Sequence, residues 1–478
     1  MRPCLRLLSV LLATLGCAPM AAAAAPALHA ASGLHVVSDR QLDSRLLAVS
    51  VSTPALDGPA DNPAVHGPAN VRILLPSGYA SHPHRRYPVL YLLHGTNGGA
   101  ADWTEFGGAE QTTADLPLIV VMPDIALSDT GGGWCTNWVN GGAYGPPEWE
   151  RFHIDQLIPW IDRNLRTIAS RDGRAIAGLS QGGFCSTSYP ARHPDMFSAS
   201  LSFSGAPDIA YDKSAWGPST AIINVTETLY DHVPTNSIFG PRATNEINWA
   251  THDPATLASN LRGINILLYT GNGQPGPLDM PPVSAFASSI EALVHEDTLA
   301  FHARLQALGI PSYLDDYGPG THSFPYWARD LKQSIGRVMA DFAHPPRPPA
   351  RITYTIADGR YSVFGWTVSM HRHVEEFSTL QNAGVRGFVL SGSGSATVLT
   401  PRFYRRGTRY LVTLRGRRVH RSQIAITGRR GRLRIEVPLG PSNPYQQYTA
   451  AALAARTAVY TTTVKVAPLP RRRQGGRG

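Results

Sequence analysis

Two different patterns of hydrophobic and polar residues divide the chain near residue 344. In the first part, short apolar runs of strand length alternate with longer stretches of helical period, such as 149–165 and 290–308. The apolar runs are candidate buried strands and lie at 71–75, 89–93, 118–122, 175–177, 199–203 and 264–269. Alternating strands and helices predict an α/β fold, with a largely parallel sheet covered by helices on both faces.

After residue 344 the pattern is that of an all-β domain. Alternating apolar and polar residues are separated by Gly, Ser and Pro turns and lie at 351–356, 387–390, 410–414, 433–437 and 458–466. Alternation with a period of two predicts a β-sandwich. The proline-rich segment 344–349 predicts a stiff linker, because proline lacks the N–H donor that a helix or a sheet needs. We therefore expect a first domain at 31–343, a linker at 344–350, a sandwich at 351–466 and a disordered arginine-rich tail at 467–478.

Residues 1–30 differ from both parts. Arg2 and Arg6 precede the apolar run 7–12, and an alanine-rich stretch with A-x-A-like cleavage sites follows. This order predicts a secretory signal peptide, and hence a protein that is secreted or associated with the cell envelope.

A membrane anchor and a lipoprotein are the two alternatives to a cleaved leader. Gly16 and Pro19 interrupt the apolar run before it reaches membrane-spanning length, which argues against an anchor. A lipoprotein attached through Cys17 is less consistent with the sequence, because Thr14 stands where a leucine-like residue is expected.

Charge separates the two parts sharply. Residues 1–348 carry 21 Lys+Arg against 30 Asp+Glu, whereas residues 349–478 carry 22 against 4. The formal net charge of +9 therefore hides a strongly basic second domain. This domain could bind an anionic cell-envelope polymer or lipid surface, or it could simply pack on the acidic first domain. Nucleic acid is not an expected partner of an exported protein.

The candidate chemistry centres on Gly178-Leu179-Ser180-Gln181-Gly182, which follows the apolar run 175–177 and precedes a helical stretch. A sharp turn from strand to helix is the context of a nucleophile elbow, in which flanking glycines avoid Cβ clashes and the central hydroxyl stands clear of the sheet. This context predicts Ser180 as a nucleophile. The N–H of Gln181, directly after it, is then an expected oxyanion donor.

A serine nucleophile needs an imidazole to take its proton and a carboxylate to orient that imidazole. His322 lies on a loop after the last strand-like run and before the helical stretch 326–342, where an α/β-hydrolase carries its base. The residues alone leave the acid open. Four candidates lie between residue 269 and His322, namely Asp279, Glu291, Glu296 and Asp297.

Four blocks of the chain resemble the esterase D-type α/β-hydrolases, and specifically the secreted mycolyltransferases of the antigen 85 kind. The blocks are Tyr91-Leu92-Leu93-His94-Gly95, the motif around Ser180, Tyr269-Thr270-Gly271-Asn272-Gly273 and Gly320-Thr321-His322-Ser323-Phe324-Pro325-Tyr326-Trp327. The resemblance covers roughly residues 35–342. It implies a Ser-His-Glu triad whose acid is Glu291, with Asp297 as the second choice.

The resemblance also implies residues around the triad. Thr96 N–H becomes the second oxyanion donor, and the glycines of its loop allow substrate to approach Asn97. Gln181 and His94 depart from the family, which carries an apolar residue and an aspartate there, so a mycolate donor and a trehalose acceptor are not implied.

Four tryptophans are expected in loops around the site, where an aromatic ring, that of Trp103 in particular, could bind an acyl chain or a sugar. About half of these side chains could instead be packed in the hydrophobic core. They are Trp103, Trp134, Trp138 and Trp149.

Two cysteines, Cys135 and Cys185, remain once the leader is set aside. In an oxidising compartment an isolated pair predicts a disulfide, with two unpaired buried thiols as the alternative. His371 and His373 alternate along one strand without an evident third ligand, so we expect no metal site. The proposed chemistry needs no organic cofactor.

The sequence therefore predicts a secreted serine esterase or acyltransferase that acts on lipid- or sugar-linked acyl esters through an acyl-enzyme. A peptidase would use the same triad, but the histidine block is of the esterase type. A different class is a non-catalytic cell-envelope binding protein that retains a relic hydrolase fold. Hydrolysis and transfer to a sugar alcohol, as in mycolyltransferases, need the same residues, so the sequence leaves both open.

Overall fold

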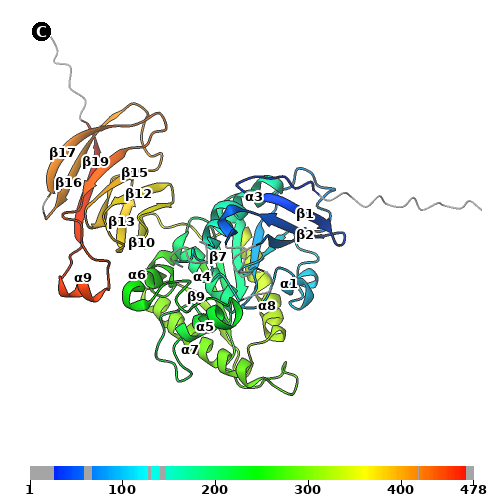
Figure 1. Ribbon diagram of the computed structural model, residues 1–478. Helices are drawn as coiled ribbons and strands as arrows, with labels where there is room; N and C mark the ends of the chain where they lie inside the picture. Colours follow the sequence, from blue (N-terminus) through cyan, green and yellow to red (C-terminus); the bar gives the residue numbers. More distant parts are fainter. Residues whose placement is uncertain (1–25, 59–66, 128–130, 140–146, 418, 470–478) are drawn as a thin grey trace, which may run out of the picture.

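A computed structural model describes residues 26–58, 67–127, 131–139, 147–417 and 419–469. Figure 1 shows two bodies: an α/β body, coloured blue to yellow-green, and an all-β body, coloured yellow to red. Most of the predicted signal peptide and arginine-rich tail lies outside the described residues. No helix in the described part of the chain is long and apolar enough to cross a membrane.

The α/β body includes the last residues of the predicted leader. Leu28 is buried in its core, and the carbonyl of His29 accepts the indole N–H of Trp160 at 2.8 Å. Leader cleavage after His29 would remove these contacts.

A nine-stranded sheet forms the centre of the α/β body. In order across the sheet the strands are β1 (His35–Gln41), β2 (Leu46–Ser52), β3 (Ala69–Leu74), β5 (Ile119–Pro123), β4 (Val89–Leu93), β6 (Arg174–Leu179), β7 (Ala199–Phe203), β8 (Asn265–Thr270) and β9 (Ser312–Asp316). Across the sheet, the neighbouring strands β5, β4, β6, β7, β8 and β9 pair in parallel. The pairs β1–β2, β2–β3 and β3–β5 are antiparallel. The predicted, mostly parallel sheet is confirmed.

Helices cover both faces of this sheet because successive strand residues point to opposite sides. In β8, for example, Leu267 and Tyr269 pack toward α8, whereas Ile266 and Leu268 pack toward α7. One face carries α1 (Asp102–Glu105), α2 (Ala109–Thr112) and α8 (Phe324–Ala343); the other carries η3 (Arg151–Leu157), α3 (Ile158–Asn164), α4 (Gln181–Arg192) and α7 (Ala285–Ala307). The other helices in the described part of this body are η1 (Pro54–Leu56), η4 (Arg171–Gly173), α5 (Thr220–Val225), η5 (Thr226–Tyr230), α6 (Arg242–His252) and η6 (Ala258–Leu261).

Two antiparallel sheets form the second body, which we call the sandwich. The six-stranded sheet contains β10 (Ile352–Ile356), β13 (Ser378–Gly384), β14 (Gly387–Gly392), β19 (Tyr460–Pro468), β16 (Arg409–Gly416) and β17 (Val419–Ile426). The four-stranded sheet contains β11 (Arg360–Val363), β12 (Trp366–His371), β15 (Ser395–Leu399) and β18 (Arg434–Pro438). Side chains of both sheets, such as Val368 and Leu390, share one core, and α9 (Ala450–Ala454) precedes β19.

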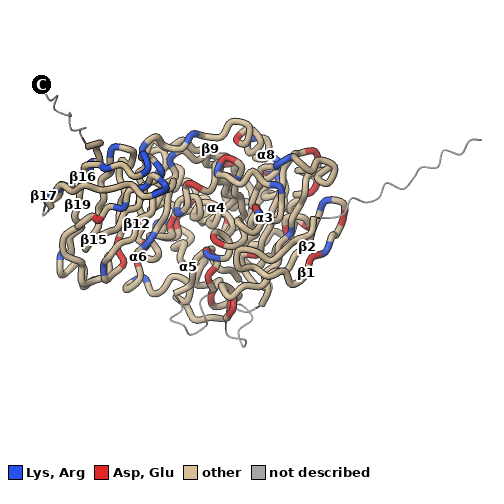
Figure 2. Tube along the Cα trace, turned by 90° about the horizontal axis from the view of Figure 1, so that it is seen from above, with Lys and Arg blue, Asp and Glu red and all other residues tan. Residues whose placement is uncertain are grey.

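The sandwich contacts the α/β body through buried polar groups. Arg192, at the end of α4, forms ion pairs with Glu150 at 2.7 Å and with Asp358 of the sandwich at 3.1 Å. The side chain of Asn260 donates to the carbonyl of Thr355 at 2.8 Å and accepts its N–H at 2.9 Å. Figure 2 shows the blue-rich sandwich beside the α/β body. The one ion pair across this junction among the described residues uses an acidic residue of the sandwich, so its many arginines are not what holds the two bodies together.

Candidate active site

Ser180 occupies the turn between β6 and α4. Its backbone angles, φ 52° and ψ −120°, lie in a region that L-residues rarely adopt and that nucleophile elbows require. The flanking glycines make this turn possible. A Cβ on Gly178 would lie 2.3 Å from the carbonyl oxygen of Gly182, and a Cβ on Gly182 would lie 2.3 Å from the carbonyl oxygen of His94.

His322 and Glu291 form a hydrogen-bonded pair beside this turn. His322 Nδ1 lies 2.7 Å from Glu291 Oε2. The carboxylate, which is fully buried in α7, is held by its other oxygen, which accepts the N–H of Gly271 at 2.8 Å and the hydroxyl of Ser204 at 2.8 Å. His322 Nε2 is buried without a hydrogen-bond partner among the described residues. An imidazole fixed in this way can accept a proton at Nε2.

The alternative acids have other partners. Asp297, also in α7, accepts the N–H of Asp208 at 2.8 Å and the hydroxyl of Ser219 at 3.2 Å. Asp279 accepts the hydroxyl of Tyr326 at 2.9 Å and that of Thr321, the residue before the histidine. Asp279 therefore anchors the histidine loop from both sides of His322, a role that the sequence analysis missed.

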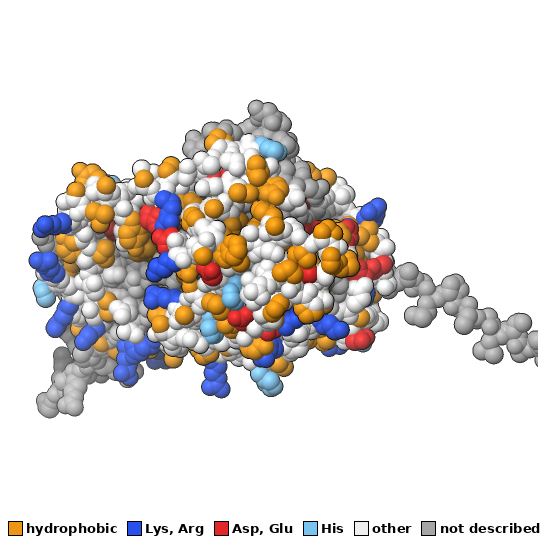
Figure 3. All heavy atoms as spheres, turned by 90° about the horizontal axis from the view of Figure 1, so that it is seen from below, with side chains coloured by type: hydrophobic (Ala, Val, Ile, Leu, Met, Phe, Trp, Pro, Cys, Tyr) orange, Lys and Arg blue, Asp and Glu red, His pale blue; other side chains and the backbone are white. Residues whose placement is uncertain are grey.

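A pocket of about 190 Å³ opens over the elbow, and Ser180 and His322 both line it. Asn97, one of the expected substrate contacts, lines it as well. The other walls are mainly apolar and come from α5, α7 and the start of α8, with Ile222, Val225, Phe286, Ile290, Phe324 and Trp327. Figure 3 views the molecule from below, the side on which α5 and α7 lie in Figure 1, and shows apolar side chains gathered over the middle of that face.

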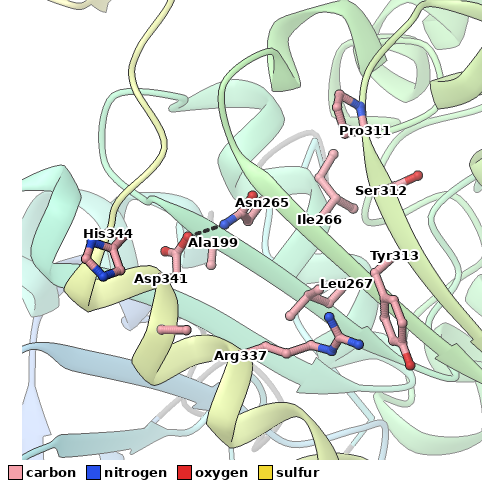
Figure 4. A pocket seen from close by; sticks show the side chains of 11 residues that line it. Ala199, Asn265, Ile266, Leu267, Pro311, Ser312, Tyr313, Arg337, Asp341 and His344 are labelled. Atoms are coloured by element: carbon pink, nitrogen blue, oxygen red, sulfur yellow. Dashed lines mark hydrogen bonds between the residues drawn. The ribbon is translucent and has the colours of Figure 1, made fainter.

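A second pocket, of about 510 Å³, lies at the amino ends of β7, β8 and β9 (Figure 4). Its two charged side chains, Arg337 and Asp341, already have partners. The Arg337 guanidinium stacks 3.8 Å from the ring centroid of Tyr313, and Asp341 accepts a hydrogen bond from Asn265. Ser180 stands at the carboxyl end of β6, the edge at which open α/β sheets bind ligands. The smaller pocket is therefore the better candidate site.

Two backbone N–H groups are available for an oxyanion. Among the described residues, the amides of Thr96 and Gln181 have no hydrogen-bond acceptor, whereas Asn97 N–H donates to the carbonyl of Gly131 at 3.0 Å. The buried side chain of Gln181 joins the surrounding loops. Its Nε2 donates to Thr96 Oγ1 at 3.0 Å, and its Oε1 accepts the N–H of Trp134 at 3.3 Å. Gln181 thus holds Thr96 in position, which an apolar residue could not do.

Replacing Gln181 by methionine should lower kcat about 10- to 100-fold with little change in KM. Methionine fills a similar volume but releases the Thr96 hydroxyl, so the loop no longer fixes the second N–H. The measurement is steady-state ester turnover. Thr96→Ser keeps the hydroxyl and should behave like the wild type, whereas Gln181→Met should add little in a Thr96→Val background. Full additivity of the two changes would contradict a shared role.

His94 links the ends of β4 and β5 as a neutral ring. Burial lowers its pKa to about 4, although a backbone hydrogen bond to Gly95 opposes that shift. Nδ1–H donates to the carbonyl of Gly95 at 2.7 Å, and Nε2 accepts the N–H of Ile125 at 2.8 Å. The histidine therefore fixes the start of the Thr96 loop.

Cys135 and Cys185 are joined by a disulfide. It ties the segment that follows Gly131 to α4, one turn after the elbow, and the ring of Trp134 packs on Phe184 beside it with centroids 5.3 Å apart. The Trp134 N–H that Gln181 accepts is adjacent to this crosslink.

The expectation that Trp103 contacts substrate is corrected by the structure. Its side chain is only 1% exposed, donates its indole N–H to the carbonyl of Leu93 at 2.9 Å and lies outside the pocket lining. The ring packs on Phe203 and on Phe324, which does line the pocket. Trp103 therefore packs against a residue of the pocket wall and does not itself line the pocket. Trp134, Trp138 and Trp149 are buried as well. Among the described residues, no group of three or more metal-binding side chains is placed to hold an ion.

Known proteins are similar to the α/β body of the chain. The model of a family described as "Putative esterase" matches residues 63–338. Esterase Rv1288 of Mycobacterium tuberculosis is 33% identical over 296 residues, which cover 61% of this chain and 59% of that protein. The diacylglycerol acyltransferase/mycolyltransferase Ag85B of Mycolicibacterium smegmatis is 28% identical over 257 residues, covering 52% and 75%. The chain thus spans about 59% of the length of the first of these relatives.

Solved structures also resemble the chain. That of Mycobacterium tuberculosis MPT51 has a TM-score of 0.46 at 24% identity and covers 59% of this chain and 96% of its own.

Proposed function

The chain belongs to the esterase family whose model spans residues 63–338, and from this premise we propose that it is a secreted serine esterase or acyltransferase with a Ser180–His322–Glu291 triad. The observation that carries the proposal is the His322–Glu291 pair at 2.7 Å, because His322, whose Nε2 has no partner among the described residues, lines the same pocket as the strained Ser180. A relic fold with no chemistry would have no need of an imidazole oriented by a buried carboxylate beside a serine in a strained turn.

The proposed reaction has two halves. Ser180 Oγ attacks the ester carbonyl while its proton passes to His322 Nε2, and the N–H groups of Thr96 and Gln181 stabilise the oxyanion. Collapse of the tetrahedral intermediate breaks the bond to the alcohol, which leaves with the proton from His322. Water or an acceptor alcohol then repeats these steps on the acyl-enzyme. Glu291 keeps His322 in the required tautomer throughout.

The pocket walls support an acyl ester as the substrate class. Ile222, Phe286 and Ile290 give one side of the pocket an apolar surface on which a lipid- or sugar-linked acyl group would be buried. Secretion is proposed from the leader-like residues 1–30, and the Cys135–Cys185 disulfide is consistent with an oxidising compartment.

Turnover of p-nitrophenyl esters from acetate to palmitate, with and without sugar alcohols, tests this function. We expect ester cleavage in all series, stoichiometric labelling of Ser180 by a fluorophosphonate, and an acylated sugar in the products if transfer competes with hydrolysis. A folded protein that shows neither ester turnover nor labelling of Ser180 would contradict the proposal. Hydrolysis without any acylated acceptor would assign the protein to the hydrolases.

A further inference from the structure

Two loops at one end of the sandwich are locked together. They are the β15–β16 loop, 400–408, and the β17–β18 loop, 427–433. Tyr404 N–H donates to the carbonyl of Gly431 at 3.1 Å, and Thr427 N–H donates to the carbonyl of Thr408 at 3.1 Å. Gly431, at φ 68°, has no room for a side chain, since a Cβ would lie 2.3 Å from the carbonyl oxygen of Tyr404. The loops therefore form one preorganised surface.

Six arginines project from this surface, and we call them the arginine platform: Arg402, Arg405, Arg406, Arg429, Arg430 and Arg432. Five are exposed. The sixth, Arg432, is half-buried and donates to the carbonyls of Thr400 at 2.6 Å and Gly365 at 2.7 Å. Figure 2, which looks down on the molecule of Figure 1, shows blue segments gathered on the sandwich.

The platform has no counter-charge of its own. All four acidic residues of the sandwich have partners elsewhere: Asp358 with Arg192, Glu375 with Gln446, Glu376 with Asn443, and Glu436 with Arg434. No ion pair among the described residues includes a platform arginine. Burial lowers the pKa of Arg432, and repulsion from Arg402 and Arg430 lowers it further.

We propose that the arginine platform binds a linear anionic polymer with closely spaced phosphate groups. Two loops fixed to each other present several guanidinium groups at once, and the planar guanidinium fork matches phosphate oxygens bidentately. A single phosphate would satisfy only part of the platform. A polymer neutralises several arginines together and releases its condensed counterions, which favours binding at low salt.

Binding of long-chain inorganic polyphosphate to the full-length protein tests the proposal. The wild type should bind with an affinity that falls steeply with salt. The variant Arg402→Gln/Arg406→Gln/Arg430→Gln should bind roughly 100-fold more weakly at low salt, and its slope of log affinity against log salt should fall by about two. Ester turnover and the unfolding midpoint should not change, because these side chains are exposed and lie far along the chain from the triad.

A matched variant separates the platform from overall charge. Arg415→Gln/Arg417→Gln/Arg456→Gln removes the same charge from exposed positions outside the platform and should bind like the wild type. Equal weakening of both variants would overturn the proposal. So would tighter binding to anionic phospholipid vesicles or to single-stranded DNA than to polyphosphate, competition by orthophosphate at equal phosphate concentration, or loss of binding on deletion of residues 470–478 alone.

Discussion

Replacing Ser180 by alanine is expected to lower kcat for ester turnover roughly 100,000-fold, with little change in KM. The substitution removes only the hydroxyl group, so the pocket and the backbone N–H groups proposed to bind the oxyanion are retained. The remaining rate then comes from water that attacks the bound ester. His322→Ala should cost about as much, because the triad acts as one unit, and Glu291→Gln somewhat less. Steady-state kinetics with p-nitrophenyl esters gives all three values.

Ser202→Ala is the matched control for this prediction. Ser202 lies in β7, and its buried hydroxyl has no partner among the described residues, so its removal should leave kcat unchanged. Wild-type turnover in Ser180→Ala, with the same unfolding midpoint as the wild type, would show that another residue carries the chemistry.

The parts of the fold that could be predicted are those in which one residue pattern decides the structure. The strands β4, β5 and β6 are nearly continuous apolar runs because both of their faces are buried. β1 was missed because it is a largely exposed edge strand, and β9 because its residues are only half-buried. An edge strand buries too little apolar surface to leave a clear signal.

The acid of the proposed triad is the part of the site that the residues alone did not identify. Glu291 and Asp297 lie in the same helix and are both fully buried, so neither position nor hydropathy separates them. The two carboxylates differ in the backbone amide from which each accepts a hydrogen bond. Glu291 faces the amide of Gly271 at the end of β8, whereas Asp297 faces the amide of Asp208. The resemblance to a family favoured Glu291, and the carboxylate of this residue lies 2.7 Å from His322 Nδ1.

The supporting residues could not be predicted because their contacts join distant parts of the chain. Gln181 reaches Thr96 across 85 residues, and Asp279 reaches Thr321 across 42. In the sequence, the glutamine directly after Ser180 is only a departure from the family, because its two partners lie far away along the chain. The burial of Trp103 follows from packing that has no local pattern either.

Arg192→Met is expected to lower the free energy of unfolding of the α/β body by about 3–5 kcal/mol. Arg192 is buried at the end of α4, the helix that follows Ser180, and its removal leaves Glu150 charged and buried. Burial alone would raise the pKa of Glu150, but Arg192, His193 and His252 together hold it well below its ordinary value. Urea unfolding monitored by tryptophan fluorescence measures the loss.

The pH dependence identifies the cause of this loss. Because the pKa of Glu150 is depressed in the folded protein, its ion pair stabilises the wild type fully above about pH 4.5, the value for the unfolded chain, and the stabilisation is lost as the pH falls through the lower folded value. In Arg192→Met, the part of the free energy of unfolding that is lost at low pH should therefore be smaller than in the wild type. Arg192→Met/Glu150→Met removes both charges and should recover part of the stability, since paired apolar side chains replace a buried ion pair at little cost. A double variant less stable than Arg192→Met would mean that the packing of Arg192, and not its charge, supports the junction.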